Sequence, residues 1–142
     1  MLDKAIALAA AHFEGKFDKG GQPYILHCLH VMHAVCPNQD DHELMCIAVM
    51  HDLVEDTDID LDDLYALGFS QRVVAGVDCM THRAGEDYMD VYIQRIALNR
   101  DARLVKIQDL DHNSQMMRMK GIRQKDFRRI EKYQRAYQYL KD

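Results

Sequence analysis

The chain has 142 residues, of which 48% are hydrophobic and 29% charged, a composition typical of a soluble globular protein. Its length suits one domain with a sizeable core, and we expect a single domain over residues 1–142. The formal net charge of −5 argues against a binder of nucleic acid polymers, because no basic excess is available to neutralise a phosphate backbone.

Helical patterns follow one another along nearly the whole chain. Apolar residues at helical spacing predict a first helix over about 2–13 and a second over about 24–35, which begins after Pro23 and ends before Pro37. Asp40 or Asp41 can cap a third helix that runs to His51. Further helices are expected over about 61–67, 71–80, 86–98, 101–118 and 124–140. No window alternates at period two, so we expect an all-α, compact bundle of about eight helices.

The cysteines and the N-terminus indicate where the chain resides. Its four cysteines are scattered without a Cys-x-x-Cys pair, as in proteins of a reducing compartment. The N-terminus lacks the pattern of a signal peptide, and no apolar run approaches the roughly 18 residues of a membrane span. We therefore expect a cytoplasmic location and no membrane contact.

The densest chemical signal is His51-Asp52-Leu53-Val54-Glu55-Asp56-Thr57. Residues four apart on a helix lie about 5–6 Å from one another, which would place His51 over Glu55 and Asp52 over Asp56. Such a group could ligate a metal ion and handle a water molecule. A solvated acidic helix end explains the same residues equally well. An EF-hand is excluded, because Leu61 and Leu67 stand where the calcium loop needs Gly and Glu.

Two further elements add to this signal. His27 lies one turn into the second predicted helix, and Asp109 shares a helix face with Lys106 and Asn113. The order of these residues is His, then His-Asp, then a distant Asp. In this order the chain resembles the HD metal-dependent phosphohydrolases, and within them the RelA/SpoT-type alarmone hydrolases, including the small stand-alone ones. Four segments carry this resemblance: Ala11-His12 with Gly15-Lys16, Gly21 to His27, His51 to Thr57, and Lys106 to Asp109.

The resemblance implies an HD-domain-like fold and a set of roles. The four metal ligands would be His27, His51, Asp52 and Asp109. The implied cofactor is a divalent metal, usually Mn²⁺, and two imidazoles with two carboxylates suit Mn²⁺ or Fe²⁺ while leaving Zn²⁺ open. The implied activity is removal of the 3′-pyrophosphate from guanosine tetra- or pentaphosphate.

The same resemblance assigns the remaining roles. Glu55 and Asp56 would position and activate the attacking water, and Asn113 would help to hold the substrate near the metal. Lys19, Lys106 and Arg83 are further candidates for substrate binding, with solvated surface positions as the alternative. The basic run from Lys120 to Arg129 fits a solvated helix face, and phosphate contact is the alternative reading.

The loop before Pro23 departs from the alarmone pattern. Alarmone hydrolases carry a basic pair there, and Asp18-Lys19 stands in its place, so one cation has become an acid. We therefore expect weaker cleavage of guanosine tetraphosphate or a different phosphorylated substrate. On this interpretation Asp18→Arg should improve alarmone turnover.

Three functions remain open at this point. The first is a metal-dependent hydrolase of a nucleotide pyrophosphate, and the second is an HD hydrolase of another nucleotide or phosphoester. The third is a catalytically idle HD module that binds metal and nucleotide. The presence of both Glu55 and Asp56 favours an enzyme. The expected partner is a small nucleotide, and the sequence leaves homo-oligomerisation open.

Overall fold

The computed structural model describes all 142 residues and confirms the all-α prediction. The only strand-like pairing is an isolated bridge between Phe17 and Pro23. The helices are α1 (Leu2–His12), α2 (Tyr24–Val35), α3 (His42–Met50), α4 (Leu53–Asp56), α5 (Leu61–Ala66), α6 (Gln71–Met80), α7 (Gln94–Ala97), α8 (Arg100–Asn113) and α9 (Gln124–Lys141). A π-helical segment over Tyr88–Ile93 leads directly into α7, and a 3₁₀ turn over Met116–Arg118 precedes α9.

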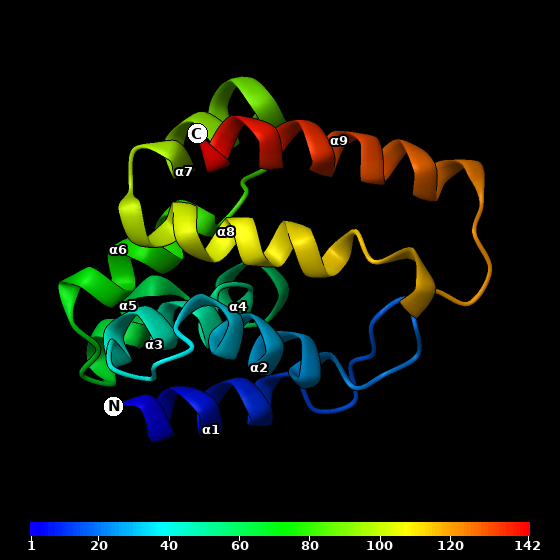
Figure 1. Cartoon of the computed structure of the whole chain (residues 1–142). Coiled ribbons are helices and arrows are strands. Elements are labelled where there is room, and N and C mark those ends of the chain that lie inside the picture. Colours follow the sequence, from blue (N-terminus) through cyan, green and yellow to red (C-terminus); the bar gives the residue numbers. More distant parts are fainter.

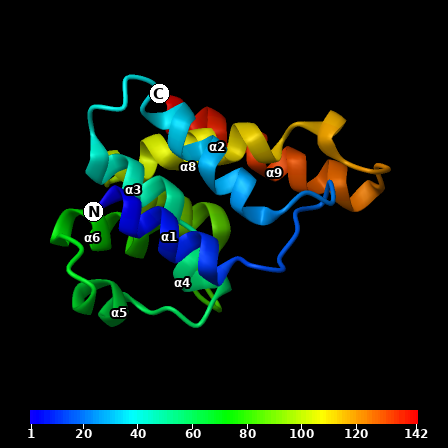
Figure 2. The same cartoon turned by 90° about the horizontal axis from the view of Figure 1, so that it is seen from below.

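The helices are arranged around α3 and α8. In Figures 1 and 2, α2 runs beside α3 and α8, α1 lies along the outer side of α3, and α9 runs along α8 on the opposite side of the molecule. All residues from Leu44 to Met50 of α3 are at most 4% exposed, as expected for a helix that is enclosed by its neighbours. Buried apolar residues form one core of 29 residues, which holds α2, α3 and α8 in fixed relation.

Side-chain caps set several helix starts. The Asp41 carboxylate accepts a hydrogen bond from the backbone N–H of Leu44 at 3.1 Å, and the Ser70 hydroxyl accepts one from Val73 at 3.3 Å. Both caps confirm the predicted starts of α3 and α6, since each satisfies a backbone donor that lacks a partner within the helix.

The helical path is interrupted immediately after α3, where the sequence pattern suggests continuity. The His51 backbone N–H bonds the Ala48 carbonyl in a tightened turn, and His51 Nδ1 lies 2.6 Å from the same oxygen. Asp52 then leaves helical geometry, with φ −103° and ψ 1°, before the short α4 begins. The assumed stacking of His51 over Glu55 on one continuous helix is therefore wrong.

The predicted helix over 101–118 is also too long. It ends as α8 at Asn113, and the Arg118 guanidinium folds back to donate a hydrogen bond to the His112 carbonyl at 3.2 Å. This side chain adds a second hydrogen bond to a carbonyl at the helix end, which also accepts one from the Gln115 backbone N–H at 3.3 Å.

Two loops meet at one end of the molecule. The loop between α1 and α2 and the segment between α8 and α9 lie together in both views (Figures 1 and 2). Gly20 approaches so closely that a Cβ atom there would lie 2.2 Å from the Arg118 carbonyl oxygen. Only glycine allows this contact, which joins two segments almost a hundred residues apart. No helix of the chain is both long and apolar enough to cross a lipid bilayer.

Candidate active site

Four side chains from three parts of the chain converge in the interior. His27 comes from α2, His51 and Asp52 from the break between α3 and α4, and Asp109 from α8. One nitrogen or oxygen atom from each lies within 4.8 Å of the others. His27 and His51 are 1% exposed and Asp109 is 4% exposed, so these three are shielded from bulk water, while the Asp52 side chain is 17% exposed. We call these four residues the ligand group.

The unprotonated Nε2 atom of His51 faces two carboxylates and has no positively charged partner. His51 Nδ1 lies against the Ala48 carbonyl, which can only accept, so we assign the proton to Nδ1. His51 Nε2 then directs a lone pair at two carboxylates, 3.0 Å from Asp52 Oδ2 and 3.3 Å from Asp109 Oδ1. This buried nitrogen has no hydrogen bond of good geometry. A cation is needed between these atoms, and a divalent metal ion fits that need.

The shift in the His51 pKa expresses the same requirement. Burial lowers the pKa of His51, but the nearby carboxylates of Asp52 and Asp109 outweigh burial and raise it well above its usual value. The surroundings thus favour positive charge at this place, whether a proton or a metal ion supplies it.

His27 is oriented through a residue that the sequence analysis did not single out. His27 Nδ1 lies 2.7 Å from His112 Nδ1, and the latter also receives a hydrogen bond from the Arg118 guanidinium at 3.2 Å. Arginine only donates, so His112 Nδ1 is the acceptor and His27 Nδ1 carries the proton. His27 Nε2 is then free to bind a metal, 3.0 Å from Asp109 Oδ1. Burial lowers the pKa of His112 to about 4, which keeps this acceptor neutral.

Lys106 binds Asp109 in the interior, whereas the sequence analysis gave substrate phosphate as its expected partner. Its ammonium group is buried and donates a hydrogen bond to Asp109 Oδ2 at 2.9 Å, beside the rings of Tyr88 and Tyr92. Burial lowers the pKa of Lys106, but the Asp109 carboxylate outweighs burial and the net shift is upward. Lys106 therefore holds one oxygen of Asp109 and leaves the other facing the two histidines.

Glu55 and Asp56 stand at the solvent side of the ligand group. Carboxylate oxygens of Asp52, Glu55 and Asp56 lie within 4.8 Å of one another. Partial burial and then the Asp52 charge raise the pKa of Glu55, and the same causes raise the pKa of Asp56 to about 6. Glu55 Oε1 also accepts a hydrogen bond from the His82 backbone at 2.7 Å. This hydrogen bond orients Glu55 and partly opposes the rise in its pKa, which burial and the Asp52 charge still dominate. A carboxylate with a raised pKa is a stronger base than a free one, as water activation requires.

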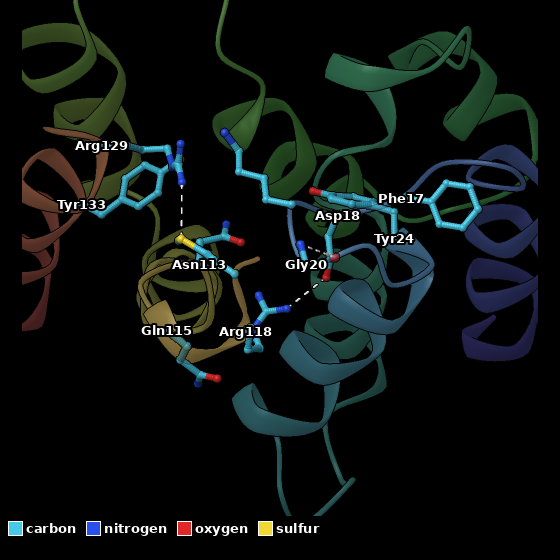
Figure 3. Close-up of a pocket in the computed structure, with 11 residues that line it drawn as sticks. Phe17, Asp18, Gly20, Tyr24, Asn113, Gln115, Arg118, Arg129 and Tyr133 are labelled. Atoms are coloured by element: carbon cyan, nitrogen blue, oxygen red, sulfur yellow. Dashed lines mark hydrogen bonds and ion pairs between the residues drawn. The ribbon is translucent and has the colours of Figure 1, made fainter. Parts of the chain in front are cut away.

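A cavity of about 260 Å³ opens beside this centre (Figure 3). Figure 3 shows Arg129 and Tyr133 on one wall, Asp18, Gly20 and Tyr24 on the other, and Asn113 and Arg118 between them. Two hydrogen bonds connect the cavity to the ligand group. Asn113 Nδ2 donates to Asp109 Oδ1 at 2.9 Å, and the Tyr24 hydroxyl donates to Asp52. The cavity also contains Lys19, so the structure brings two predicted substrate contacts, Asn113 and Lys19, to one space.

Asp18 organises the loop that forms the cavity wall. Its Oδ1 accepts hydrogen bonds from the backbone N–H groups of Gly20 and Gln22, both at 2.9 Å, and its Oδ2 pairs with Arg118 at 3.0 Å. The acid is neutralised by an arginine that also lines the cavity. Asp18→Arg would remove all three contacts and place two arginines together, so this change would disturb the cavity wall rather than restore a useful basic pair.

Arg83 is not brought to the cavity. Its guanidinium pairs with Asp78 and donates to the Thr81 carbonyl at 3.0 Å, at the end of α6. The structure gives no support to its expected contact with a substrate phosphate.

Sequence reasoning missed several residues of the centre. Tyr24 lies within the resembling segment Gly21 to His27, and His112 directly precedes Asn113; these neighbours are the signal that could have found them. Arg118 stands at the end of the helix predicted over 101–118, and only its tertiary contact with Asp18 reveals its role.

Known proteins similar to this chain are named as enzymes of guanosine polyphosphate synthesis or hydrolysis. The chain is 29% identical to a guanosine-3′,5′-bis(diphosphate) 3′-pyrophosphohydrolase of Haemophilus influenzae over 84% of its own length, and 28% identical to the bifunctional (p)ppGpp synthase/hydrolase SpoT of Escherichia coli over 90%. It is 30% identical to a GTP pyrophosphokinase of Streptomyces coelicolor over 82%. The chain spans 19%, 19% and 15% of these relatives, respectively. No family model matches the chain.

A solved structure confirms the fold. A metazoan ortholog of SpoT that hydrolyses ppGpp superposes with a TM-score of 0.80, covering 98% of this chain and 84% of that one at 22% identity. The chain therefore has an HD-domain-like all-α fold, and its resemblance to the RelA/SpoT-type HD proteins is confirmed.

Proposed function

We propose that the chain is a divalent-metal-dependent phosphohydrolase that releases pyrophosphate from the 3′ position of guanosine 3′,5′-bis(diphosphate). The observation that carries this proposal is the ligand group itself. Two histidine Nε2 atoms face carboxylate oxygens in the interior, and two further carboxylates stand beside them at the solvent side. The similarity to bacterial 3′-pyrophosphohydrolases supports the choice of substrate.

The ligand group would hold one Mn²⁺ ion, because two imidazole nitrogens and two carboxylate oxygens are donors that this ion accepts. When bound, the metal supplies Lewis-acid polarisation of a phosphoryl group and a more acidic water. Two neutral imidazoles and two carboxylates would leave the loaded centre formally neutral, so the anionic substrate is not repelled.

Glu55 and Asp56 would do the proton chemistry. Their raised pKa values suit groups that take a proton from the attacking water near neutral pH. The His82 backbone N–H holds Glu55 in place, and the Lys16 ammonium group donates to the Asp56 backbone carbonyl and fixes the end of α4. Both carboxylates are thus positioned before the substrate arrives.

The nucleotide would occupy the cavity, with Asn113 next to the ligand group and positive side chains at its walls. Lys19, Arg118 and Arg129 all line this space. Lys19 forms no ion pair and would offset charge on the substrate, whereas Arg118 and Arg129, which are paired with Asp18 and Asp126, would donate hydrogen bonds to it. Tyr133 presents an aromatic ring for the base. We place the reaction in a reducing cytoplasm, because all four cysteines are free.

The test is a hydrolysis assay of the purified chain with Mn²⁺, Mg²⁺, Fe²⁺ or Zn²⁺, or with a chelator alone. We expect guanosine 3′,5′-bis(diphosphate) to give GDP and pyrophosphate with Mn²⁺ and no product with the chelator. Cleavage of other nucleotides or phosphoesters in preference would favour an HD hydrolase of different specificity. Metal and nucleotide binding without any turnover would favour the idle module.

A further inference from the structure

A second basic depression adjoins the nucleotide cavity. It measures about 380 Å³ and lies between the 3₁₀ turn and the start of α9. Four cations line it, and we call them the basic cluster: Lys19, Lys120, Arg123 and Lys125. The chain carries a net charge of −5, yet eight of its 18 Lys and Arg residues fall between positions 118 and 135, where only two acids occur.

The cations of the basic cluster are free to meet an anion. The acid within the depression, Asp126, is 7% exposed, pairs with Arg129 at 2.9 Å and accepts a hydrogen bond from the Arg123 backbone at 2.9 Å. The other nearby ion pair joins Arg118 to Asp18. No member of the basic cluster forms a salt bridge, so its charges are not cancelled within the protein.

The backbone holds these cations near one another. Lys120 Nζ lies only 3.0 Å from where a Cβ of Gly21 would stand, so this lysine extends over the loop that carries Lys19. Burial lowers the pKa of Lys19, and repulsion from Arg129 and Lys125 adds to this shift while Asp126 opposes it. Bringing an anion here would relieve that repulsion.

The basic cluster is continuous with the cavity, and through it with the ligand group. Lys19 and Met119 line both spaces. Asn113 and Tyr24, which also line the cavity, bond Asp109 and Asp52 of the ligand group. The cavity therefore adjoins both the ligand group and the basic cluster, and a ligand with two anionic groups could reach both.

We propose that the basic cluster is a second anion subsite, which binds the 5′-diphosphate of the nucleotide whose 3′-diphosphate lies at the ligand group. This inference rests on the proposed function, since it assigns the second end of the same substrate. The shared chemistry is a diphosphate, which free inorganic pyrophosphate also offers. The nucleotide is favoured because the cluster opens into the cavity rather than standing apart from it.

The test compares a variant carrying Lys120→Gln, Arg123→Gln and Lys125→Gln with the unmodified chain on two nucleotides. Guanosine 3′,5′-bis(diphosphate) carries both diphosphates, and guanosine 3′-diphosphate lacks the 5′ one. Each exposed charge contact contributes up to a few-fold, so we expect KM for the bis(diphosphate) to rise about tenfold with kcat unchanged. KM for guanosine 3′-diphosphate should not change. An equal rise for both nucleotides, or no rise for either, overturns the subsite.

Arg128→Gln is the matched control, because it removes one exposed cation of the same helix that lines a different depression. It should leave both KM values unchanged. Inorganic pyrophosphate tests the other source of the anion. If pyrophosphate binding is lost in the triple variant while KM for the bis(diphosphate) stays the same, the cluster binds a free anion and the nucleotide assignment is wrong.

Binding by calorimetry separates this inference from the proposed function. Both nucleotides are titrated into a chain with Glu55→Gln and Asp56→Asn, with and without the triple substitution. Tighter binding of the bis(diphosphate), abolished by the triple substitution, supports the subsite even if the unmodified chain hydrolyses nothing. If the unmodified chain hydrolyses both nucleotides with equal KM, the proposed function is supported and the inferred subsite is contradicted.

Discussion

Each histidine of the ligand group is oriented through its second nitrogen. His51 donates from Nδ1 to the Ala48 carbonyl, and His27 donates from Nδ1 to His112. Both rings consequently present an unprotonated Nε2 toward Asp109. The two hydrogen bonds do not touch the metal position themselves, and they decide which nitrogen faces it.

Removing the acceptor of His27 should weaken the metal site. In His112→Ala, His27 is free to rotate or to change tautomer, and we expect Mn²⁺ affinity to fall about tenfold or more. His112→Gln keeps a carbonyl acceptor and should recover part of the loss. His30→Ala is the control, because His30 stacks on the His112 ring without a hydrogen bond. Titration with Mn²⁺ measures this, and equal affinity in His112→Ala would show that His27 needs no partner.

The water-handling pair can be separated from metal binding. With Glu55→Gln and Asp56→Asn, the ligand group is intact and Mn²⁺ should bind nearly as before. Turnover should fall by roughly 10²–10⁴-fold, the usual contribution of acid–base groups. Metal content by atomic absorption and steady-state kinetics together decide the point. If the double variant is as active as the unmodified chain, these acids are only a solvated helix end.

At the scale of elements, the active-site wall depends on the contact of two loops. Gly20 lies against the Arg118 carbonyl, and a methyl group would have to displace it. We expect Gly20→Ala to lower the free energy of unfolding by about 1–3 kcal/mol and to raise KM, because the cavity wall must shift. Metal affinity should be unchanged, since the ligand group lies on α2, α8 and the break after α3.

Gln22→Ala is the control for this loop, because the Gln22 side chain is exposed and Gln22 bonds Asp18 through its backbone N–H and carbonyl alone. Chemical unfolding and steady-state kinetics measure both variants. A Gly20→Ala chain with unchanged KM would mean that the two loops move independently of substrate binding.

Most helices of the bundle are predictable from periodicity and caps, and the two failures both involve a side chain that bonds a helix carbonyl. The His51 ring competes for the Ala48 carbonyl, and the Arg118 guanidinium folds back onto the His112 carbonyl at the end of α8. Apolar spacing carries no information about such competition. Both breaks lie at the active site, where the first aims Asp52 into the ligand group and the second places Arg118 at the cavity.

At the scale of the whole molecule, acid stability depends on a surface network that joins three helices. Arg72 of α6 pairs with Asp41 and Glu43 at the start of α3 and with Asp101 of α8, at 2.8, 3.1 and 2.8 Å. Hydrogen bonding to Arg72 holds the pKa of Asp41 below its ordinary value of 3.8. A carboxyl with a lowered pKa in the folded chain stabilises it above pH 3.8, and that stability is lost as the pH falls through the lowered pKa.

We expect Arg72→Met to lower the free energy of unfolding by about 1–2 kcal/mol at pH 7, because several paired charges are released at a partly exposed position. The difference from the unmodified chain should shrink as the pH falls below 3.8. Arg83→Met, which breaks one exposed pair with Asp78, should cost about 0.5 kcal/mol or less. Urea unfolding at several pH values measures this. If the difference in free energy of unfolding between Arg72→Met and the unmodified chain grows toward acid pH, the stabilising role of these ion pairs is contradicted.

The sequence predicts the ligand group more fully than its surroundings. His27, His51, Asp52 and Asp109 belong to short motifs, and a motif states residue type and spacing directly. The partners of Lys106 and Asp18 depend on how α8 and two distant loops pack, which spacing does not contain. For this reason Lys106 is expected from its spacing to bind phosphate and Asp18 to remove a positive charge. In the structure Lys106 binds Asp109, and Asp18 pairs with Arg118.

The central claim is that His27, His51, Asp52 and Asp109 together hold one divalent ion. The most direct test is anomalous diffraction at the manganese edge from crystals of the unmodified chain grown with Mn²⁺. We predict a single strong peak in contact with His27 Nε2, His51 Nε2 and a carboxylate oxygen each of Asp52 and Asp109. The absence of a peak there, or a peak that one of the four side chains does not reach, would contradict the claim.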